Sequence, residues 1–179
     1  MPELLLSIEG KHFERQYLLY IIECTHGEDK YYYIGQTGDP KHTTARPTFR
    51  RLTAHLEDSG RSTQNQVYRY LAVEVLGISY AAKKNSAFDK KTKQAVEDYL
   101  VKSNVKMYAY PLQPFVPSVE HSQHLNIVRK VVLFERIVIN LFLKHSKNIM
   151  NKNIIQPPKQ TDWSYPQALD QIKTDFKLS

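Results

Sequence analysis

Two short tyrosine-rich segments with a polar break between them constrain the fold more than any other part of this sequence. Residues 16–24 read QYLLYIIEC, residues 25–29 read THGED, and KYYYIG follows. Aromatic and β-branched residues on both sides of a short polar break are typical of a β-hairpin. A loop over residues 25–28 would place Tyr20 opposite Tyr33 on one face of the sheet. A slip of one residue would turn one of these tyrosines to the other face.

A predicted helix over residues 47–58 follows the hairpin. It begins at Pro47, a residue that is favoured in the first turn of a helix. An apolar stripe with spacing i, i+3, i+7 is formed by Phe49, Leu52 and Leu56. At about 100° per residue, Arg51 and His55 lie beside this stripe, so we expect them to border the buried face together.

The remaining pattern predicts a small α+β fold in which helices flank a central, mainly antiparallel sheet of about three strands. Residues 105–110 alternate like a third strand, and residues 92–102 and about 166–176 read as amphipathic helices. Residues 67–76 fit either a helix or a strand. We expect one domain over 1–155 with an inserted helical segment at about 57–104, and a C-terminal extension over 156–179. The insertion carries a lysine-rich loop with Lys83, Lys84, Lys90 and Lys91.

The strongest helical pattern runs from about residue 125 to residue 144 and contains VVLFERIVINLFL. A helix that is apolar almost all round is typically buried. Glu135 stands in its middle, with no basic residue at the i±3 and i±4 positions to pair with it. Burying an unpaired carboxylate costs several kcal/mol, so Glu135 needs a partner from elsewhere in the chain or from solution. A structural ion pair with Arg51 and a metal ion are both open at this point.

The charge balance favours a polyanionic partner, although charge alone proves little. The chain has 25 Lys and Arg against 18 Asp and Glu, which gives a net charge of +7. The single cysteine, Cys24, excludes a disulfide framework and a cysteine-rich zinc site, and it fits a reducing cytoplasm. No apolar run approaches the ~18 residues of a membrane span, and the N-terminus lacks the basic region of a secretory signal. We therefore expect a cytoplasmic protein without a membrane partner.

Taken together, the tyrosines, the Arg-His pair and the isolated glutamate resemble the GIY-YIG nuclease family. The matching segments are Leu18-Leu19-Tyr20, Tyr33-Ile34-Gly35 with Gln36-Thr37, Arg51 and His55, Glu135, and a later asparagine at Asn151 or Asn148. Asn151 is preferred because the apolar Met150 precedes it, as the family pattern expects. The resemblance covers residues 17–56 and 128–151. It departs from the family in reading LLY for GIY, in a longer loop before the arginine helix, and in the inserted segment.

The resemblance implies a metal-dependent endonuclease that hydrolyses phosphodiester bonds, with double-stranded DNA preferred over RNA. It implies that Glu135 holds one divalent metal ion, Mg²⁺ or alternatively Mn²⁺, and that Arg51 binds the scissile phosphate. Tyr20 would act as general base, which requires nearby cations to lower its pKa from the ordinary value of ~10. Tyr33 and His55 would position water or phosphate or shuttle the proton, and the lysines of the insertion would follow the nucleic-acid backbone. A monomer and a homodimer are both compatible with this function.

Two readings compete with an active nuclease. One is a nucleic-acid-binding module of the same fold that has lost catalysis, and the other is a structural protein whose tyrosines and basic face contact other proteins. Taken singly, the two tyrosines fit ordinary sheet aromatics, and Arg51 and His55 fit a solvated helix edge. The other histidines, among them His121 and His124, show no ligand spacing and are expected on the surface.

Overall fold

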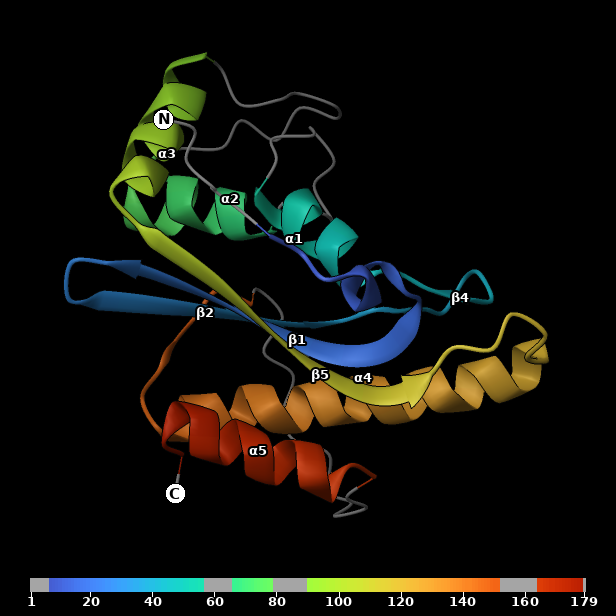
Figure 1. Cartoon of the computed structure of the whole chain (residues 1–179). Helices are drawn as coiled ribbons and strands as arrows, with labels where there is room; N and C mark the ends of the chain where they lie inside the picture. The colour runs from blue at the N-terminus through green and yellow to red at the C-terminus, as the bar shows by residue number, and fades with distance from the viewer. Residues whose placement is uncertain (1–6, 57–65, 79–89, 152–163, 179) are drawn as a thin grey trace.

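A four-stranded sheet forms the centre of the molecule. The computed structural model describes residues 7–56, 66–78, 90–151 and 164–178. Within these ranges the strands are β1 (Gln16–His26), β2 (Asp29–Gln36), β5 (Asn104–Pro114) and β6 (Asn148–Ile149), in the order β5-β1-β2-β6. Three strands are antiparallel, and β6 is parallel to β2 (Figure 1). The α+β, mainly antiparallel class is confirmed, whereas the expected count of three strands is wrong because a two-residue strand such as β6 carries no periodic signal.

The β1–β2 hairpin is tighter than its sequence suggested. Gly27 has φ +58°, a conformation that glycine adopts without steric cost, and the strands pair as far as His26 with Asp29. The predicted register is therefore wrong by two residues: Tyr20 pairs with Gly35, and Tyr33 pairs with Ile22. Because a shift of two preserves the alternation of faces, both tyrosines still lie on one face, with ring centroids 6.2 Å apart.

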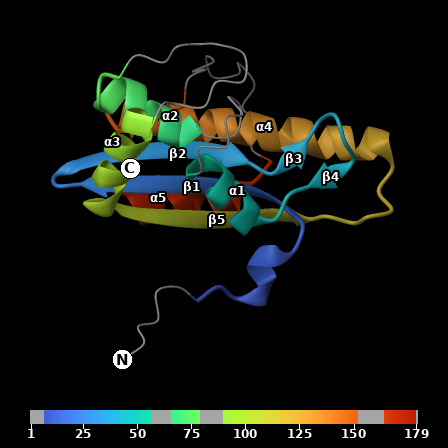
Figure 2. The same ribbon diagram turned by 90° about the horizontal axis from the view of Figure 1, so that it is seen from above.

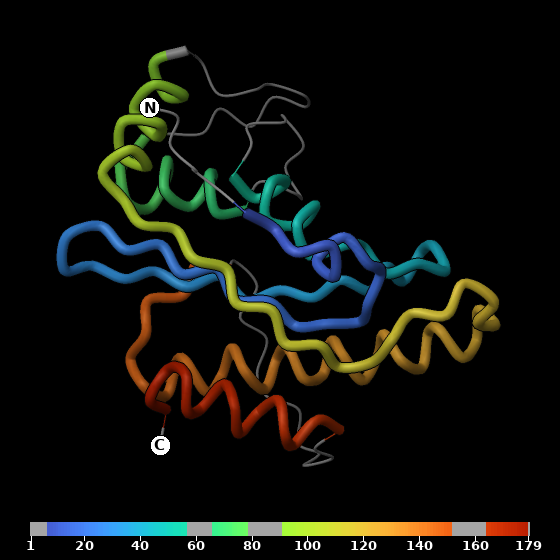
Figure 3. Tube along the Cα trace, viewed as in Figure 1, coloured from blue at the N-terminus to red at the C-terminus, as the bar shows by residue number. Residues whose placement is uncertain are grey.

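Helices cover both faces of the sheet, as Figures 1 and 3 show. The face that carries Tyr20 packs on α1 (Thr48–Leu56), α2 (Gln66–Tyr70), the π-helical segment η2 (Leu71–Val75) and α3 (Lys90–Val101). The opposite face packs on α4 (His121–Lys144) and α5 (Pro166–Phe176). Successive residues of β1 point to opposite faces, so Tyr20 and Ile22 enter one core cluster and Leu19 and Ile21 enter the other.

The described part of the predicted insertion, residues 57–104, is mainly helical. Residues 67–76 form α2, η2 and the turn after them, and the helix predicted at 92–102 is confirmed as α3, which begins two residues earlier. Lys83 and Lys84 lie outside the described residues, as does the side chain of Lys90. Lys91 is exposed near the start of α3.

The C-terminal half supplies the second core layer. The last helix, predicted at about 166–176, is confirmed as α5, and its Leu169, Ile172 and Phe176 belong to the same core cluster as Leu19 and Ile21. The long helix begins four residues earlier than expected, at His121. Figure 2 shows that α4 runs along the β2 side of the sheet, whereas α5 lies beneath β1 and β5.

Three smaller features complete the described chain. A 3₁₀ turn, η1 (Gly10–Phe13), precedes β1, and β3 (Gly38–Asp39) pairs with β4 (Thr44–Ala45) between β2 and α1. Strand β5 continues past Pro111, which a proline permits at the edge of a sheet.

Among the described helices, none has both the length and the apolarity that a membrane crossing requires.

Candidate active site

The hydroxyl group of Tyr20 is the centre of a buried polar cluster. Arg51 approaches from α1 and places its Nε 3.1 Å and one terminal nitrogen 2.9 Å from the Tyr20 oxygen. His55, one turn further along α1, places its Nε2 2.8 Å from the same oxygen. Tyr20 and His55 are both 0% exposed, so His55 is buried and does not border the buried face as its sequence position suggested.

The hydrogen-bond donors and acceptors in this cluster fix the direction of the Tyr20 proton. A guanidinium has no acceptor, so both Arg51 contacts use lone pairs of the phenol oxygen. The phenol therefore donates its proton to Nε2 of His55, which must be unprotonated to accept it. Burial and the neighbouring Arg51 lower the pKa of His55 to about 3, which agrees with a neutral ring. Its Nδ1, which then carries the proton, has no hydrogen-bond partner within the described ranges.

The Tyr20 ring fits only because residue 35 is glycine. A Cβ at position 35 would overlap Cζ and Oη of Tyr20, and Tyr20 lies directly opposite Gly35 in the hairpin. The glycine of the Tyr-Ile-Gly motif thus provides the space in which the phenol turns toward α1. Positive φ is not involved here, since only Gly27 and Gly77 among the described glycines have it.

Tyr33 packs beside this cluster. Its ring centroid lies 4.3 Å from that of His55 and 6.2 Å from that of Tyr20. Burial, together with the nearby Tyr20 and Glu135, raises the pKa of Tyr33 well above its ordinary value. Burial also raises the pKa of Tyr20, although Arg51 opposes that shift. Arg51 alone therefore does not produce the low pKa that a phenolate base would need.

Glu135 lies on α4, the helix that packs on the opposite face of the sheet, and it interacts electrostatically with Arg51, Tyr20 and Tyr33. Burial raises the pKa of its carboxyl group to about 7, while Arg51 and Arg136 act in the opposite direction. The negative charge of Glu135 in turn raises the pKa of Tyr20 and of Tyr33. No hydrogen bond or ion pair joins Glu135 to another described residue, so the expected structural ion pair with Arg51 is absent from this part of the chain.

The two candidate asparagines occupy different places. Asn151 accepts a hydrogen bond from the N–H of Ile34 at 3.0 Å and donates one to the carbonyl oxygen of the same residue. It therefore clamps the backbone of β2 between Tyr33 and Gly35. Asn148 donates to the carbonyl oxygen of Lys30 near the other end of the strand. Asn151 is thus a positioning residue beside the cluster, and Asn148 is not.

His124 ties the first turn of α4 to β1 and β3. It is 0% exposed, so the expectation that it lies on the surface is wrong. Its Nε2 lies 2.8 Å from the carbonyl oxygen of Asp39, which can only accept, so Nδ1 accepts the proton of the Tyr17 hydroxyl at 2.6 Å. Gly38 brings the chain equally close to α4, since a Cβ there would overlap the Val128 side chain. These contacts hold the helix that carries Glu135.

The donor set at the cluster suits a hard cation with few protein ligands. The oxygen donors are the carboxylate of Glu135 and the phenols of Tyr20 and Tyr33. Mg²⁺ is commonly held by one or two carboxylates, with water and phosphate filling the rest of its shell. In the described ranges no three or more His, Cys, Asp and Glu side chains gather into a metal site, so a multidentate protein cage is not present there.

Comparisons of the chain with protein-family models, with curated proteins and with solved structures give no match. The family resemblance therefore rests on the sequence motifs alone.

The first prediction concerns the contact between Gly35 and Tyr20. Gly35→Ala introduces a methyl group into space that the buried phenol occupies, so we expect a loss of about 1–3 kcal/mol in the free energy of unfolding. Urea titration measures this change. Gly10→Ala is the matched control, because a Cβ at Gly10 meets nothing within 4 Å. Equal stability of the two variants would contradict the packing described here.

The second prediction concerns the carboxyl group of Glu135. Its pKa of about 7 in the folded chain lies above the ordinary glutamate value of 4.5, so the unfolded chain loses this proton first as pH rises. The contribution of this carboxyl group to the free energy of unfolding is therefore complete below about pH 4.5 and is lost as the pH rises through about 7. Relative to Glu135→Gln, the wild-type free energy of unfolding should fall by about 2 kcal/mol between pH 5 and pH 8. His55 is common to both proteins, so parallel pH curves would refute this assignment.

Proposed function

We propose that this protein is a metal-dependent endonuclease that hydrolyses phosphodiester bonds of double-stranded DNA. One observation carries the proposal: the partly buried carboxylate of Glu135 has no described partner, yet it interacts electrostatically with Arg51, Tyr20 and Tyr33. Such a carboxylate is expensive unless a cation or proton neutralises it. Arg51, Tyr20 and Tyr33, whose ionisation its charge influences, would bind and orient a phosphate and a water molecule together with His55.

Arg51 would bind the scissile phosphate. Its guanidinium carries planar N–H donors that suit phosphate oxygens, and in the free protein two of its nitrogens contact the Tyr20 oxygen. When a phosphate takes over these donors, the lone pairs of the phenol become free. The fully buried oxygen of Tyr20 could then accept a proton from water that enters with the substrate.

Tyr20 and His55 together would move the proton of the attacking water. The Tyr20 proton already points at Nε2 of His55, so accepting a proton from water and passing its own to His55 avoids a free phenolate. Because no phenolate forms in this relay, the raised pKa of Tyr20 does not prevent it. The pKa of His55 is low in part because of Arg51, and a phosphate that neutralises Arg51 would raise it.

Glu135 would hold the divalent cation, Mg²⁺ or Mn²⁺. The bound cation would supply positive charge for the phosphate and the leaving oxygen. Asn151 and Gly35 would keep β2 in place, so that Tyr33 stays packed against His55.

The alternative function is a nucleic-acid-binding module without catalysis. The complete burial of Tyr20 favours it, because a general base must reach solvent or substrate. The two functions differ in one measurable property, the cleavage of DNA.

The third prediction is Mg²⁺-dependent cleavage of supercoiled plasmid DNA. Glu135→Gln should abolish cleavage, and Tyr20→Phe should lower its rate by about 10²–10⁴-fold, because general-base catalysis contributes about that much. DNA affinity should be unchanged in Tyr20→Phe. Matched controls are Glu97→Gln on the exposed side of α3 and Tyr32→Phe on the opposite face of the sheet, which should both cut normally.

Three outcomes decide between the functions. Salt-sensitive DNA binding without cleavage would replace the nuclease by the binding module. Full activity of Tyr20→Phe would remove Tyr20 as the base while leaving the nuclease itself intact. The absence of both binding and cleavage would favour a protein-contacting role.

A further inference from the structure

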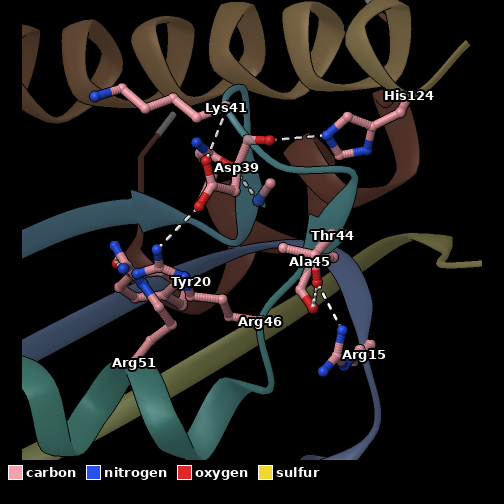
Figure 4. A network of polar contacts seen from close by, with 11 residues as sticks. Arg15, Tyr20, Asp39, Lys41, Thr44, Ala45, Arg46, Arg51 and His124 are labelled. Carbon is pink, nitrogen blue, oxygen red and sulfur yellow. Dashed lines mark hydrogen bonds and ion pairs between the residues drawn. The ribbon is translucent and has the colours of Figure 1, made fainter. Parts of the chain in front are cut away.

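A cavity of about 430 Å³ opens beside α1, next to the phenol cluster. Four arginines and one carboxylate line it: Arg15, Asp39, Arg46, Arg50 and Arg51. We call it the arginine cavity. Figure 4 shows three of these arginines, which come from different segments: Arg15 precedes β1, Arg46 follows β4, and Arg51 lies on α1. Because Arg51 also contacts Tyr20, the cavity and the candidate active site share a wall.

The charges in the arginine cavity do not balance. Asp39 forms an ion pair with Arg46 at 3.0 Å, and this pair is neutral. Among the described residues, Arg15 donates only to the hydroxyl group of Thr44, at 2.8 Å, and the side chain of Arg50 has no hydrogen bond or ion pair. Within the same residues, Arg51 is hydrogen-bonded only to a neutral phenol. Three guanidinium groups therefore face one cavity without a bound counter-charge from the described chain.

The wall of the cavity is held in a fixed position. Asp39 pairs with Arg46 through its carboxylate, and its carbonyl oxygen accepts the hydrogen bond from the buried His124 of α4. The same residue thus connects the arginine cavity to the helix that carries Glu135. Guanidinium groups around a preformed cavity suit a phosphate, because each can donate paired N–H groups to its oxygens.

We propose that the arginine cavity binds a backbone phosphate of the DNA strand adjacent to the phosphate that Arg51 holds. Arg15 and Arg50 would bind this neighbouring phosphate, and Arg51 would stand between the two positions. This inference rests on the proposed function, since it names where the substrate strand continues beyond the scissile bond. Contacts of this kind position the strand and do not read its sequence.

Binding of a labelled DNA duplex, measured by fluorescence anisotropy in EDTA over a series of KCl concentrations, tests the proposal without cleavage. The variants are Arg15→Ala, Arg50→Ala and the double variant. Each single change should weaken binding roughly tenfold, as expected for loss of a charged hydrogen bond. Each should also lower the slope of log K against log [KCl] by about one. Arg129→Ala, an exposed arginine on α4 outside the cavity, is the matched control and should bind like wild type.

The outcomes separate this inference from the proposed function. If the slope of log K against log [KCl] is the same in the double variant as in the wild type, the inference is overturned even if the wild type cuts DNA. A reduced slope in a protein that never cuts would support the arginine cavity and overturn the nuclease. A third outcome is that inorganic phosphate stabilises the wild type but not the double variant while the slope of log K for DNA binding against log [KCl] stays the same in both. That result would identify a site for small anions and would also overturn the inference. Neither Arg15 nor Arg50 lies in the core, so thermal unfolding should confirm that the variants fold.

Discussion

The close approach of the Tyr20 ring to the backbone of Gly35 is the constraint on which the site depends. It requires a glycine in β2 and a hairpin register that places this glycine opposite Tyr20. The phenol then turns toward α1, where Arg51 and His55 share its oxygen. Two adjacent strands and one helix therefore fix the phenol, the guanidinium and the imidazole relative to one another.

The two opposite charges nearest the phenols, Arg51 and Glu135, form no ion pair with each other. Arg51 is bonded to a neutral group, and Glu135 is close enough to influence it without forming an ion pair. A buried charge without a partner costs several kcal/mol, so both groups are costly unless a ligand or a proton neutralises them. The proposed cation at Glu135 and the proposed phosphate at Arg51 would supply the missing counter-charges, and Arg15 and Arg50 of the arginine cavity likewise lack a described acidic partner. This arrangement supports phosphodiester chemistry over a purely structural role.

The sequence predicted the parts of this fold that repeat with a regular period. Alternation in the hairpin placed Tyr20 and Tyr33 on one face, the 3.6-residue period placed α1 and α5, and the isolation of Glu135 marked it as unusual. The register failed because one glycine shortened the turn, and a two-residue strand has too few residues to detect. Contacts between distant segments left no sequence signal, among them Asn151 with Ile34, His124 with Asp39, and Arg15 with Thr44.

Calorimetric titration with Mg²⁺ would reveal whether Glu135 binds a divalent cation, as we propose. The folded pKa of Glu135 is about 7, so Mg²⁺ competes with a proton there. With a DNA duplex that the protein cannot cut present, we expect clear binding by the wild type at pH 8, weaker binding at pH 6, and none by Glu135→Gln at either pH. Equal binding by wild type and Glu135→Gln, or no binding by the wild type at pH 8 in the presence of a DNA duplex that it cannot cut, would contradict it.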